Sequence, residues 1–353
     1  MGDERPTLDT VARAAGVSRM TVSNAYNRPD QLSPATRERV LAAAEQLGYA
    51  GPDPAARSLR RRSSGTIGVL LTDRLSNAFS DPGLVSLLRG LADELGAAGQ
   101  SMLLVPSEAE AVGDLVRGSL VDAFVVCSMA ESDEAVQAVL QRRLPLVTVG
   151  HPRLSGVPLV GIDNGRAASR AADHLLELGH RRIAILGLPG RDPGDTQSTD
   201  VPVRWGVRDR ADAVRRTVEA VPRTRVTQRD AAVNTHEEGV RLATELLDVP
   251  ASARPTALFA VTDVLALAAY EAARDLGLAI PDDLSVVGFD DIEQAHRASP
   301  ALTTISQDLQ GKGRIAARTV LDLVAGEKPR TPRLSAELVV RDSTAPPPRK
   351  AGS

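Results

Sequence analysis

Cysteine is almost absent from this sequence of 353 residues, which contains only Cys127. A single cysteine excludes an internal disulfide framework. Because it lies in the apolar run 123–128, we expect a buried small side chain rather than a nucleophile. No run approaches the roughly 18 apolar residues of a membrane span. The polar, acidic start MGDERPTLD does not resemble a signal peptide. Together these absences predict a cytoplasmic protein with no membrane partner.

The chain has no overall excess of basic charge, but its basic residues are unevenly distributed. The net charge is −3, which argues against a general nucleic-acid binder. Residues 1–64 contain ten arginines and seven acidic residues, a net of +3 that leaves −6 for the remainder. A basic module on an acidic body is typical of a protein that meets a polyanion at one end. Because the excess is modest, affinity should depend on a dimer and on specific contacts. The length allows two or three domains.

Residues 7–27, TLDTVARAAGVSRMTVSNAYN, predict two short helices joined by a tight turn. Thr7 can cap the first helix, and Ser18 can cap the second. Gly16 ends the first helix where a residue of positive φ is needed. The first helix presents one apolar stripe, at positions i, i+3, i+4 and i+7: Leu8, Val11, Ala12 and Ala15.

The second helix of this pair is expected to bury Val22 and Ala25. Its outward positions are polar or long: Arg19, Met20, Thr21, Ser23, Asn24 and Asn27. Arginine and asparagine can form bidentate hydrogen bonds with guanine and adenine, and a helix fits the DNA major groove. Taken alone, the pattern favours an ordinary helical hairpin with a polar face. The rest of the chain changes that interpretation.

A third helix and a linker follow the pair. Ser33 and Pro34 suit the start of this helix, and Gly48 ends it. Its apolar face is expected to contain Val40, Ala43, Ala44 and Leu47. Beyond the GPDP stretch (51–54), AARSLRRR is either a disordered basic linker or a two-turn helix. Such a helix is too short to be stable unless it is held against a partner chain and DNA. If the segment is such a helix, Leu59 can insert between base steps in the minor groove.

From residue 66 onward, strand-length apolar runs alternate with amphipathic helices. The runs are 66–71, 101–105, 123–128, 144–150 and 158–162, then 181–186, 256–261 and 283–289. The clearest helical patterns are 84–95, 166–178 and 264–276. This alternation predicts parallel sheets covered by helices, an α/β architecture, in two similar lobes. The five histidines show no metal-ligand spacing, and no phosphate-binding loop is present. We therefore expect neither a metal nor a cofactor.

The motifs of this chain, taken in order, resemble those of the lactose-repressor (LacI/GalR) family of bacterial transcription regulators. The matching segments are the helix pair of 7–27, LSPATRERVLAAAEQLGY, ARSLR, TIGVLL, VGIDN, LLELGHRRIAIL, TDVLALAAYEAARDLGLAIPDDLSVVGFDDI, PALTTISQD and LVVRDST. The resemblance implies an N-terminal all-α helix-turn-helix headpiece and a hinge helix. It also implies an α/β core of two periplasmic-binding-protein-like lobes with parallel sheets. These lobes close around a small effector, usually a sugar or nucleoside-type metabolite.

The resemblance also divides the chain. We expect a DNA-binding domain at 1–50, a hinge at 51–64, a core at 65–345 and a disordered tail at 346–353. Within the core, the first lobe should contain about 65–164 and 300–332, and the second about 165–299 and 333–345. The tail has no leucine heptad, so we expect a homodimer rather than a tetramer.

By resemblance, the DNA contacts lie on the second helix and on the hinge. Arg19, Met20 and Asn24 match positions that read base edges, and Thr21 and Ser23 fit phosphate contacts. Asn27 and the hinge residues Arg57 and Leu59 complete the set. Tyr49 and Leu59 are ten residues apart, one more than is usual in the family, so the half-site spacing stays open.

The effector site is implied by residues expected to face the cleft between the lobes: Thr72, Asp73, Phe79, Arg210, Thr262 and Asp290. Asp290 should accept paired hydrogen bonds from vicinal hydroxyls, and Phe79 should stack on the ligand. Arg210 should clamp the ligand, with Arg204 as its rival. We therefore expect a ligand-responsive repressor of a palindromic operator rather than a solute-binding protein. An enzyme is disfavoured because no nucleophile–base pair is visible.

Overall fold

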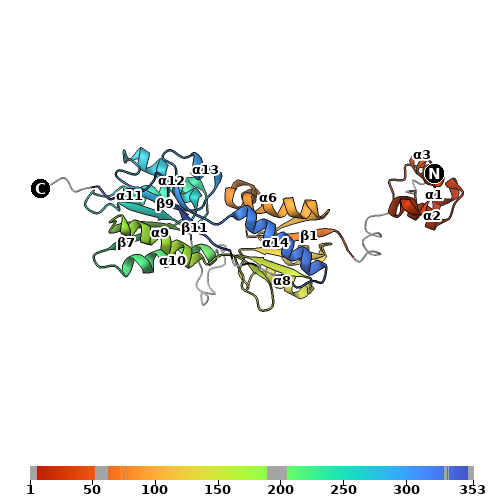
Figure 1. The fold of residues 1–353 in the computed structure, drawn as a ribbon, viewed down its shortest axis with the longest axis horizontal. Coiled ribbons are helices and arrows are strands. Elements are labelled where there is room, and N and C mark those ends of the chain that lie inside the picture. The colour runs from red at the N-terminus through yellow and green to blue at the C-terminus, as the bar shows by residue number, and fades with distance from the viewer. Residues whose placement is uncertain are drawn as a thin grey trace. The chain divides into compact units, whose positions relative to one another are not determined.

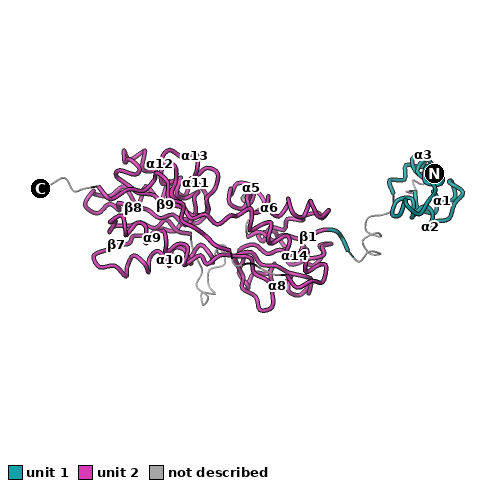
Figure 2. Tube along the Cα trace, viewed as in Figure 1, with its two compact units in different colours: residues 1–65 teal, residues 66–353 magenta. Residues whose placement is uncertain are grey.

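A computed structural model describes residues 6–51, 63–72, 74–188, 205–329, 332 and 334–348. The chain divides into two compact units, Met1–Gly65 and Thr66–Ser353, which Figure 2 shows in different colours. Four expected site residues lie outside the described residues: Arg57, Leu59, Asp73 and Arg204. No described helix has the length and apolar character that a membrane crossing requires.

The first unit contains short helices whose ends follow the expected capping pattern. They are α1 (Leu8–Ala15), α2 (Arg19–Asn27), a 3₁₀ turn at Pro29–Gln31 and α3 (Pro34–Gln46). The side chains of Thr7, Ser18 and Ser33 each accept a hydrogen bond from the backbone of the helix that they precede. Gly16 ends α1 with φ 64°, a conformation that glycine adopts without a steric penalty. The capping predictions are confirmed.

The core of the first unit corrects two expectations from the sequence. Val22 and Ala25 are buried as expected, against Val11 and Val40 among others. Ser23, expected outward, is buried with 8% exposure, because it lies at the edge of the face that α2 packs inward. Leu47, expected in the apolar face of α3, is 40% exposed, because it is the residue that caps the end of the helix.

The second unit contains two sheets (Figure 1). The first has the strand order β2-β1-β3-β4-β5 and is parallel throughout. Its strands are β1 (Thr66–Leu71), β2 (Ser101–Pro106), β3 (Ala123–Cys127), β4 (Leu146–Val149) and β5 (Leu159–Val160). The second has the order β11-β10-β9-β8-β6-β7 and is parallel except for β11. Its strands are β6 (Arg182–Gly187), β7 (Arg225–Asp230), β8 (Ala257–Ala260), β9 (Ser285–Asp290), β10 (Thr303–Ser306) and β11 (Glu337–Val339).

Helices cover both sheets, as the alternating sequence pattern predicts. With the first sheet lie α5 (Leu75–Ser80), α6 (Pro82–Ala97), α7 (Val112–Gly118), α8 (Glu134–Arg142) and α14 (Leu309–Val324). With the second lie α9 (Asn164–Glu177), α10 (Trp205–Glu219), α11 (His236–Leu247), α12 (Asp263–Asp275) and α13 (Glu293–Arg297). Along β1, Val69 packs into the cluster with α6 and α14, whereas Leu70 packs into the cluster with α7 and α8. This alternation buries both faces of the first sheet.

Helices α6 and α14 approach each other closely through glycine. A Cβ atom at Gly313 would lie 2.1 Å from the backbone oxygen of Leu87, and one at Gly90 would lie 2.0 Å from that of Gln310. Both positions therefore require glycine. The contact fixes the start of α14, and with it the residues that α14 brings to the space between the lobes.

The structure moves one predicted lobe boundary. Residues 300–332 were expected in the first lobe, but β10 pairs with β9 in the second sheet, with Thr304 opposite Gly288. The chain therefore crosses to the first lobe after Ser306, and α14 is the part that packs there. The reason is that β10 completes a buried parallel strand pair before the crossing. Strands β7, β10 and β11 were not predicted from the sequence.

Candidate functional site

Helix α2 presents an exposed surface at its first turn. Met20 is 70% exposed. The Arg19 side chain is also exposed, with a long surface ion pair of 3.6 Å to Asp9. Asn24 lies one turn beyond Met20 on the same face, half-buried. These three side chains form a compact set that can meet a ligand without unfolding the unit.

The other predicted DNA contacts of α2 form hydrogen bonds within the first unit. The Thr21 and Ser18 hydroxyl groups are 2.9 Å apart and share a hydrogen bond. Asn27 donates from Nδ2 to the backbone oxygen of Ser23 at 2.9 Å and contacts its Oγ at 3.3 Å. The Ser23 side chain is mostly buried, and its contact with phosphate stays a prediction.

The second unit contains a cavity of about 150 Å³ between the two lobes. Residues that follow the carboxyl ends of strands in both sheets line it, among them Thr72, Ser128, Thr262 and Asp290. This is the edge where open α/β sheets bind ligands. The remaining polar lining side chains are Asp81, His151, Asn164, Arg210, Asn234, Gln307 and Lys312.

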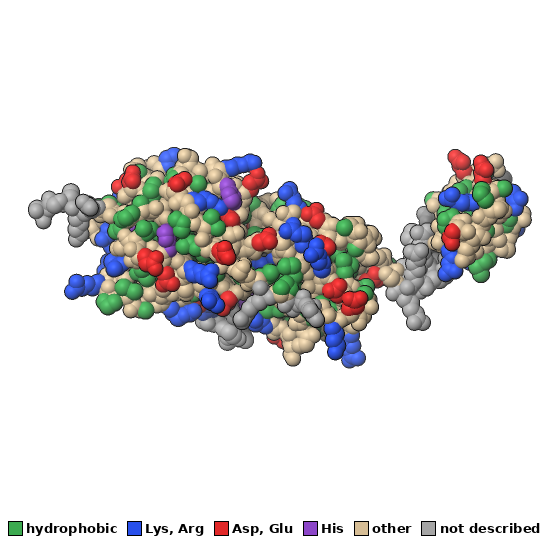
Figure 3. Space-filling model, viewed as in Figure 1, with side chains coloured by type: hydrophobic (Ala, Val, Ile, Leu, Met, Phe, Trp, Pro, Cys, Tyr) green, Lys and Arg blue, Asp and Glu red, His purple; other side chains and the backbone are tan. Residues whose placement is uncertain are grey.

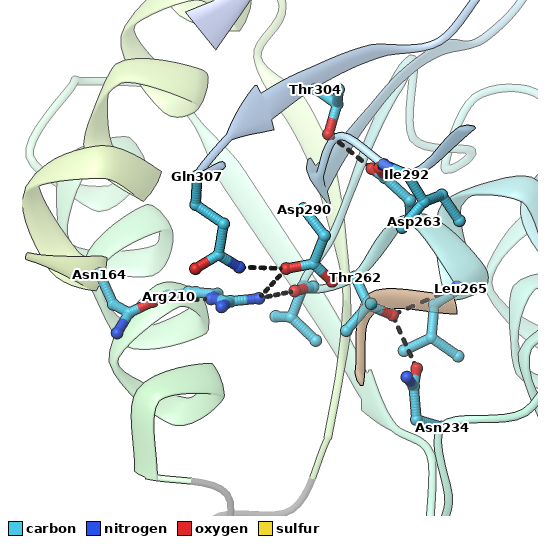
Figure 4. Close-up of polar contacts among 12 residues, drawn as sticks. Asn164, Arg210, Asn234, Thr262, Asp263, Leu265, Asp290, Ile292, Thr304 and Gln307 are labelled. Atoms are coloured by element: carbon cyan, nitrogen blue, oxygen red, sulfur yellow. Dashed lines mark hydrogen bonds and ion pairs between the residues drawn. The ribbon is translucent and has the colours of Figure 1, made fainter. Parts of the chain in front are cut away.

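Arg210, on α10, is buried at the centre of this group (Figure 4). Its Nη1 atom donates to Asp290 Oδ1 at 3.1 Å and to the backbone oxygen of Val261 at 2.7 Å. Its Nε atom donates to Asn164 Oδ1 at 3.0 Å. The guanidinium carbon lies 3.6 Å from the centre of the Phe289 ring, within the range of a cation–π contact. These contacts hold the guanidinium plane in one orientation.

Asp290 ends β9 in a strained backbone conformation, with φ 122°. Its Oδ1 atom accepts hydrogen bonds from Arg210 and from Gln307 Nε2. Burial raises the pKa of Asp290 to about 6, and the Arg210 charge opposes that rise. Within the described residues, Oδ2 has no hydrogen-bond partner, and a Cβ atom at Gly83 in the opposite lobe would lie 3.8 Å from it. One carboxylate oxygen therefore stays available to a ligand.

A second set of contacts joins the two lobes. Thr262 caps α12, and its hydroxyl group donates to Asn234 Oδ1 at 2.7 Å. Asn234 Nδ2 donates to Asp81 Oδ2 at 3.1 Å. Asp81 precedes α6 in the first lobe, whereas Asn234 and Thr262 belong to the second. Asn234 therefore forms a polar bridge across the cleft.

Asp263 supports this site from behind. Its carboxylate accepts hydrogen bonds from Thr304 Oγ1 at 2.5 Å and from the backbone nitrogen of Ile292 at 2.9 Å (Figure 4). Burial raises the pKa of Asp263 to about 7, with a further contribution from the Asp290 charge. The carboxylate ties α12 to β10 and to the segment after β9.

Phe79 does not enter the cavity. It was expected to stack on a ligand there, but it is 66% exposed and lines a neighbouring groove with Arg89 and Asp291. The reason is that α5 buries Ala78, and the next residue on a helix points about 100° away. Thr72 does line the cavity, and its hydroxyl group contacts the backbone oxygens of Cys127 and Ser128 at 3.0 and 3.1 Å.

Sequence reasoning missed seven polar residues that line the cavity, among them Asn164, Asn234 and Lys312. Asn164 stands in the VGIDN motif, which could have revealed it. Asn234 follows a strand that was not predicted, and Lys312 lies within α14 between two glycines. Neither has a local pattern that points to the cleft.

No group of three His, Cys, Asp or Glu residues in the described parts of the chain could hold a metal ion. On the face shown in Figure 3, basic and acidic side chains of the second unit are interspersed. That face of the second unit is therefore not a uniformly basic surface of the kind that binds DNA non-specifically.

Comparisons with known proteins cover both units. A family described as "Bacterial regulatory proteins, lacI family" matches residues 7–51, and a "Periplasmic binding protein-like domain" matches residues 172–344. An HTH-type transcriptional regulator of Mycobacterium tuberculosis is 40% identical over 98% of each chain. The HTH-type transcriptional repressor CytR of Escherichia coli is 33% identical over 96% of each chain.

Solved structures agree with these sequence matches. A structure titled as a complex of the transcriptional regulator CelR with cellobiose is 32% identical, covering 96% of this chain and 100% of its own, with a TM-score of 0.66. A LacI family transcriptional regulator from Enterococcus faecium with bound ribose is 26% identical, covering 80% of this chain and 99% of its own, with a TM-score of 0.65.

Proposed function

Because this chain belongs to the LacI family of bacterial transcription regulators, we propose that α2 reads operator DNA and that a small effector in the cleft controls that reading. The observation that carries the proposal is the pairing of two different surfaces in one chain. One is an exposed recognition helix in a small separate unit, and the other is a buried polar cavity between two lobes.

On the DNA side, Arg19, Met20 and Asn24 are the proposed base-reading residues. The exposure of Arg19 and Met20 and the half-buried setting of Asn24 support this, since each can contact DNA without disturbing the core of the unit. Arginine and asparagine supply the hydrogen bonds that distinguish guanine and adenine, and methionine can contact a thymine methyl group. Thr21 is proposed to contact phosphate, and Asn27 to support the end of α2.

The protein is proposed to bind a palindromic operator as a homodimer, in the cytoplasm. Two copies of a short helix give the affinity that one weakly basic unit lacks. In this proposal the hinge residues Arg57 and Leu59 contact the DNA at the centre of the operator.

On the effector side, Arg210 and Asp290 are proposed to grip the hydroxyl groups of a carbohydrate, with Thr72 and Thr262 shaping the cleft. The CelR–cellobiose and ribose-bound relatives support this ligand class. Asp290 Oδ2 can accept from a hydroxyl group, and the Arg210 guanidinium is already oriented by three protein contacts.

Effector binding is proposed to regulate transcription by changing how the lobes close, with the protein acting as a repressor. The two binding events are then coupled, and the coupling is reciprocal: effector must change operator affinity by the same factor that operator changes effector affinity. A coupling of about 1–3 kcal/mol is typical of such systems.

The test is fluorescence anisotropy on a palindrome taken from the promoter region of the encoding gene, at two salt concentrations. We expect specific binding that exceeds binding to scrambled DNA and that changes when an effector is added. A protein that binds both duplexes equally at both salt concentrations refutes the DNA proposal. An effector that binds the protein without changing operator affinity refutes the coupling.

A further inference from the structure

Lys312 is a buried cation with too few partners. It lies in the first turn of α14, is 6% exposed, and lines the cavity between the lobes. Its ammonium group donates to Gln307 Oε1, a neutral acceptor. An ammonium group has three N–H donors. Within the described residues, Lys312 makes no other hydrogen bond and no ion pair, so two donors remain for a ligand.

Arg210 is a second donor with unused capacity in the same cavity. Its Nε and Nη1 atoms are occupied by Asn164, Val261 and Asp290. Across the described part of the chain, its Nη2 atom has no partner. Two buried cations therefore share one small cavity, and each has N–H groups to spare.

The carboxylates that line the cavity have partners other than Lys312. Asp290 Oδ1 is paired with Arg210. Asp81 accepts from the backbone nitrogens of Gly83 and Leu84, and from Asn234. No carboxylate of the described residues lies within ion-pair distance of Lys312, so Asp290 and Asp308 act on its ammonium group only from farther away. That arrangement is costly unless something supplies negative charge.

The protonation of Lys312 agrees with this geometry. Burial, followed by the Arg210 charge, lowers the pKa of Lys312 to about 8. At neutral pH the side chain is still mainly an ammonium ion. An anion beside it would favour the charged form and so oppose both causes of the shift.

We propose that the effector is an acidic carbohydrate, a compact polyol whose anionic group binds Lys312 beside Arg210. This inference rests on the proposed function, since it names the ligand class of the same cleft. The hydroxyl groups of the ligand bind Asp290 Oδ2 and the Asn164 amide. The cavity, at about 150 Å³, is smaller than the roughly 300–1,000 Å³ of pockets for drug-sized ligands. A monosaccharide acid or monosaccharide phosphate is therefore the expected size.

The test is a ligand panel built as matched sets, in each of which one sugar is present as the neutral aldose, the uronic or aldonic acid, and the phosphate ester. Thermal shift ranks the compounds on the full-length protein, because a ligand of the native state raises its stability. Calorimetry then gives the Kd for the best set. We expect the acidic members to bind at least tenfold more tightly than their neutral counterpart. The carboxylate and phosphate arms show which anion is used.

Lys312→Met and Lys312→Gln separate charge from packing. Both variants should lose at least tenfold in affinity for the acidic ligand, while affinity for the neutral counterpart changes less than threefold. Glutamine keeps a hydrogen-bond donor, so an equal loss in both variants points to charge. Lys328→Met, at an exposed lysine, is the matched control and should change neither value.

Three results overturn the inference: a neutral sugar as the tightest ligand, equal losses for both ligand types in Lys312→Met, or no response to any acidic member. The failure of the proposed function looks different. If a neutral sugar binds and changes operator affinity, the regulator proposal stands and the acidic class is wrong. If ligands of every class leave operator affinity unchanged, the effector-control proposal itself fails.

Discussion

Helix α2 and the cleft differ in how far their side chains are exposed to solvent. On α2, Met20 and Arg19 are exposed and have few partners in the first unit, as proposed DNA contacts should be. In the cleft, Arg210 is buried and Asp290 is half-buried, and each favours the charged form of the other. The difference teaches that one site can be altered without harm to the fold, whereas the other is part of what holds its unit together.

The two sites also differ in how far apart their residues lie along the chain. The proposed DNA contacts of α2 lie within nine consecutive residues. The cleft joins Thr72 near the start of the second unit to Lys312 near its end. Changes should therefore act locally in the first unit and over several elements in the second. The following changes test that contrast, beginning with the largest effect.

Val22→Asp should unfold the first unit and leave the second intact. An isolated domain of this size has a stability of about 2–7 kcal/mol, and a buried unpaired charge costs more than about 4 kcal/mol. Operator binding should be abolished, while ligand binding and the melting transition of the second unit persist. Circular dichroism melts and anisotropy measure both. Ala42→Asp, at an exposed position on α3, is the control. A fall in the melting temperature of the second unit would show that the units are not independent.

Arg210→Leu should destabilise the second unit by about 3–5 kcal/mol at pH 8, because it leaves the Asp290 carboxylate buried and unpaired. The pH dependence of this loss of stability follows from the raised pKa of Asp290. That pKa is about 6 with Arg210 present and is higher without it. A raised carboxyl pKa means that the ionised form is disfavoured in the fold. The penalty therefore grows as pH rises through that pKa, and shrinks at pH 5. Urea melts at both pH values measure it.

Pairing the change with Asp290→Leu provides the control for Arg210→Leu. The double variant should recover most of the stability and none of the ligand affinity, since the buried charge and the ligand-binding group are both gone. Equal destabilisation in the single and double variants would mean that lost packing, rather than the unpaired carboxylate, causes the effect.

This contrast explains what could be read from the sequence. The helix ends at Thr7, Gly16 and Ser18 were predictable because capping depends on neighbours a few residues away. The alternating α/β pattern was predictable for buried strands such as β1. Strand β7, which is RVTQRD and mostly exposed, has no apolar run to reveal it. Ser23 was misjudged because a small polar residue at the edge of a helix face can turn either way.

The cleft was only partly predictable, for a different reason. Asp290 and Arg210 could be placed in it only through the family resemblance. Phe79 was misplaced because the direction of its side chain depends on how α5 packs. Lys312 was missed because only the close packing of α6 on α14 brings it to the cavity. Such positions follow from tertiary structure, and no local pattern encodes them.

Acid should weaken the second unit through His180, which has no counterpart in the first unit. Its ring nitrogens contact the Thr256 hydroxyl group at 2.9 Å and the Ala345 backbone oxygen at 2.9 Å, and burial lowers its pKa to about 4. A lowered histidine pKa means that the unfolded chain takes up the proton first. Stability is therefore complete above about pH 6.5 and is lost as pH falls toward 4, by about 3 kcal/mol at most.

His180→Asn tests how much His180 contributes to this loss of stability in acid. Melts of the second unit between pH 7 and pH 4 should show a smaller acid loss in the variant than in the wild type. His236→Asn, at an exposed histidine, is the control and should keep the wild-type slope. An unchanged slope in His180→Asn would assign acid sensitivity to other groups.

Arg19→Ala should cost about 1–3 kcal/mol of specific operator binding, the usual value of one bidentate base contact. The melting temperature of the first unit should stay the same, because the side chain is exposed. Anisotropy on the operator and on a duplex with one altered base pair tests both affinity and preference. Arg39→Ala, an exposed arginine on α3, should change affinity little and preference not at all. Unaltered base preference in Arg19→Ala would remove Arg19 from the base-reading set.

Asn234→Ala should have the smallest effect, and it tests whether the polar bridge of Asn234 contributes to lobe closure. The substitution removes the hydrogen bond to Asp81 across the cleft and the one to Thr262, each of which contributes about 0.5–1.5 kcal/mol. Effector affinity should fall about fivefold, because closure loses its polar bridge, while binding of operator without effector changes little. Gln137→Ala, an exposed amide that bonds only within the first lobe, is the control. If Asn234→Ala lowers stability but leaves effector affinity intact, the bridge supports the fold of the cleft and contributes nothing to its closing.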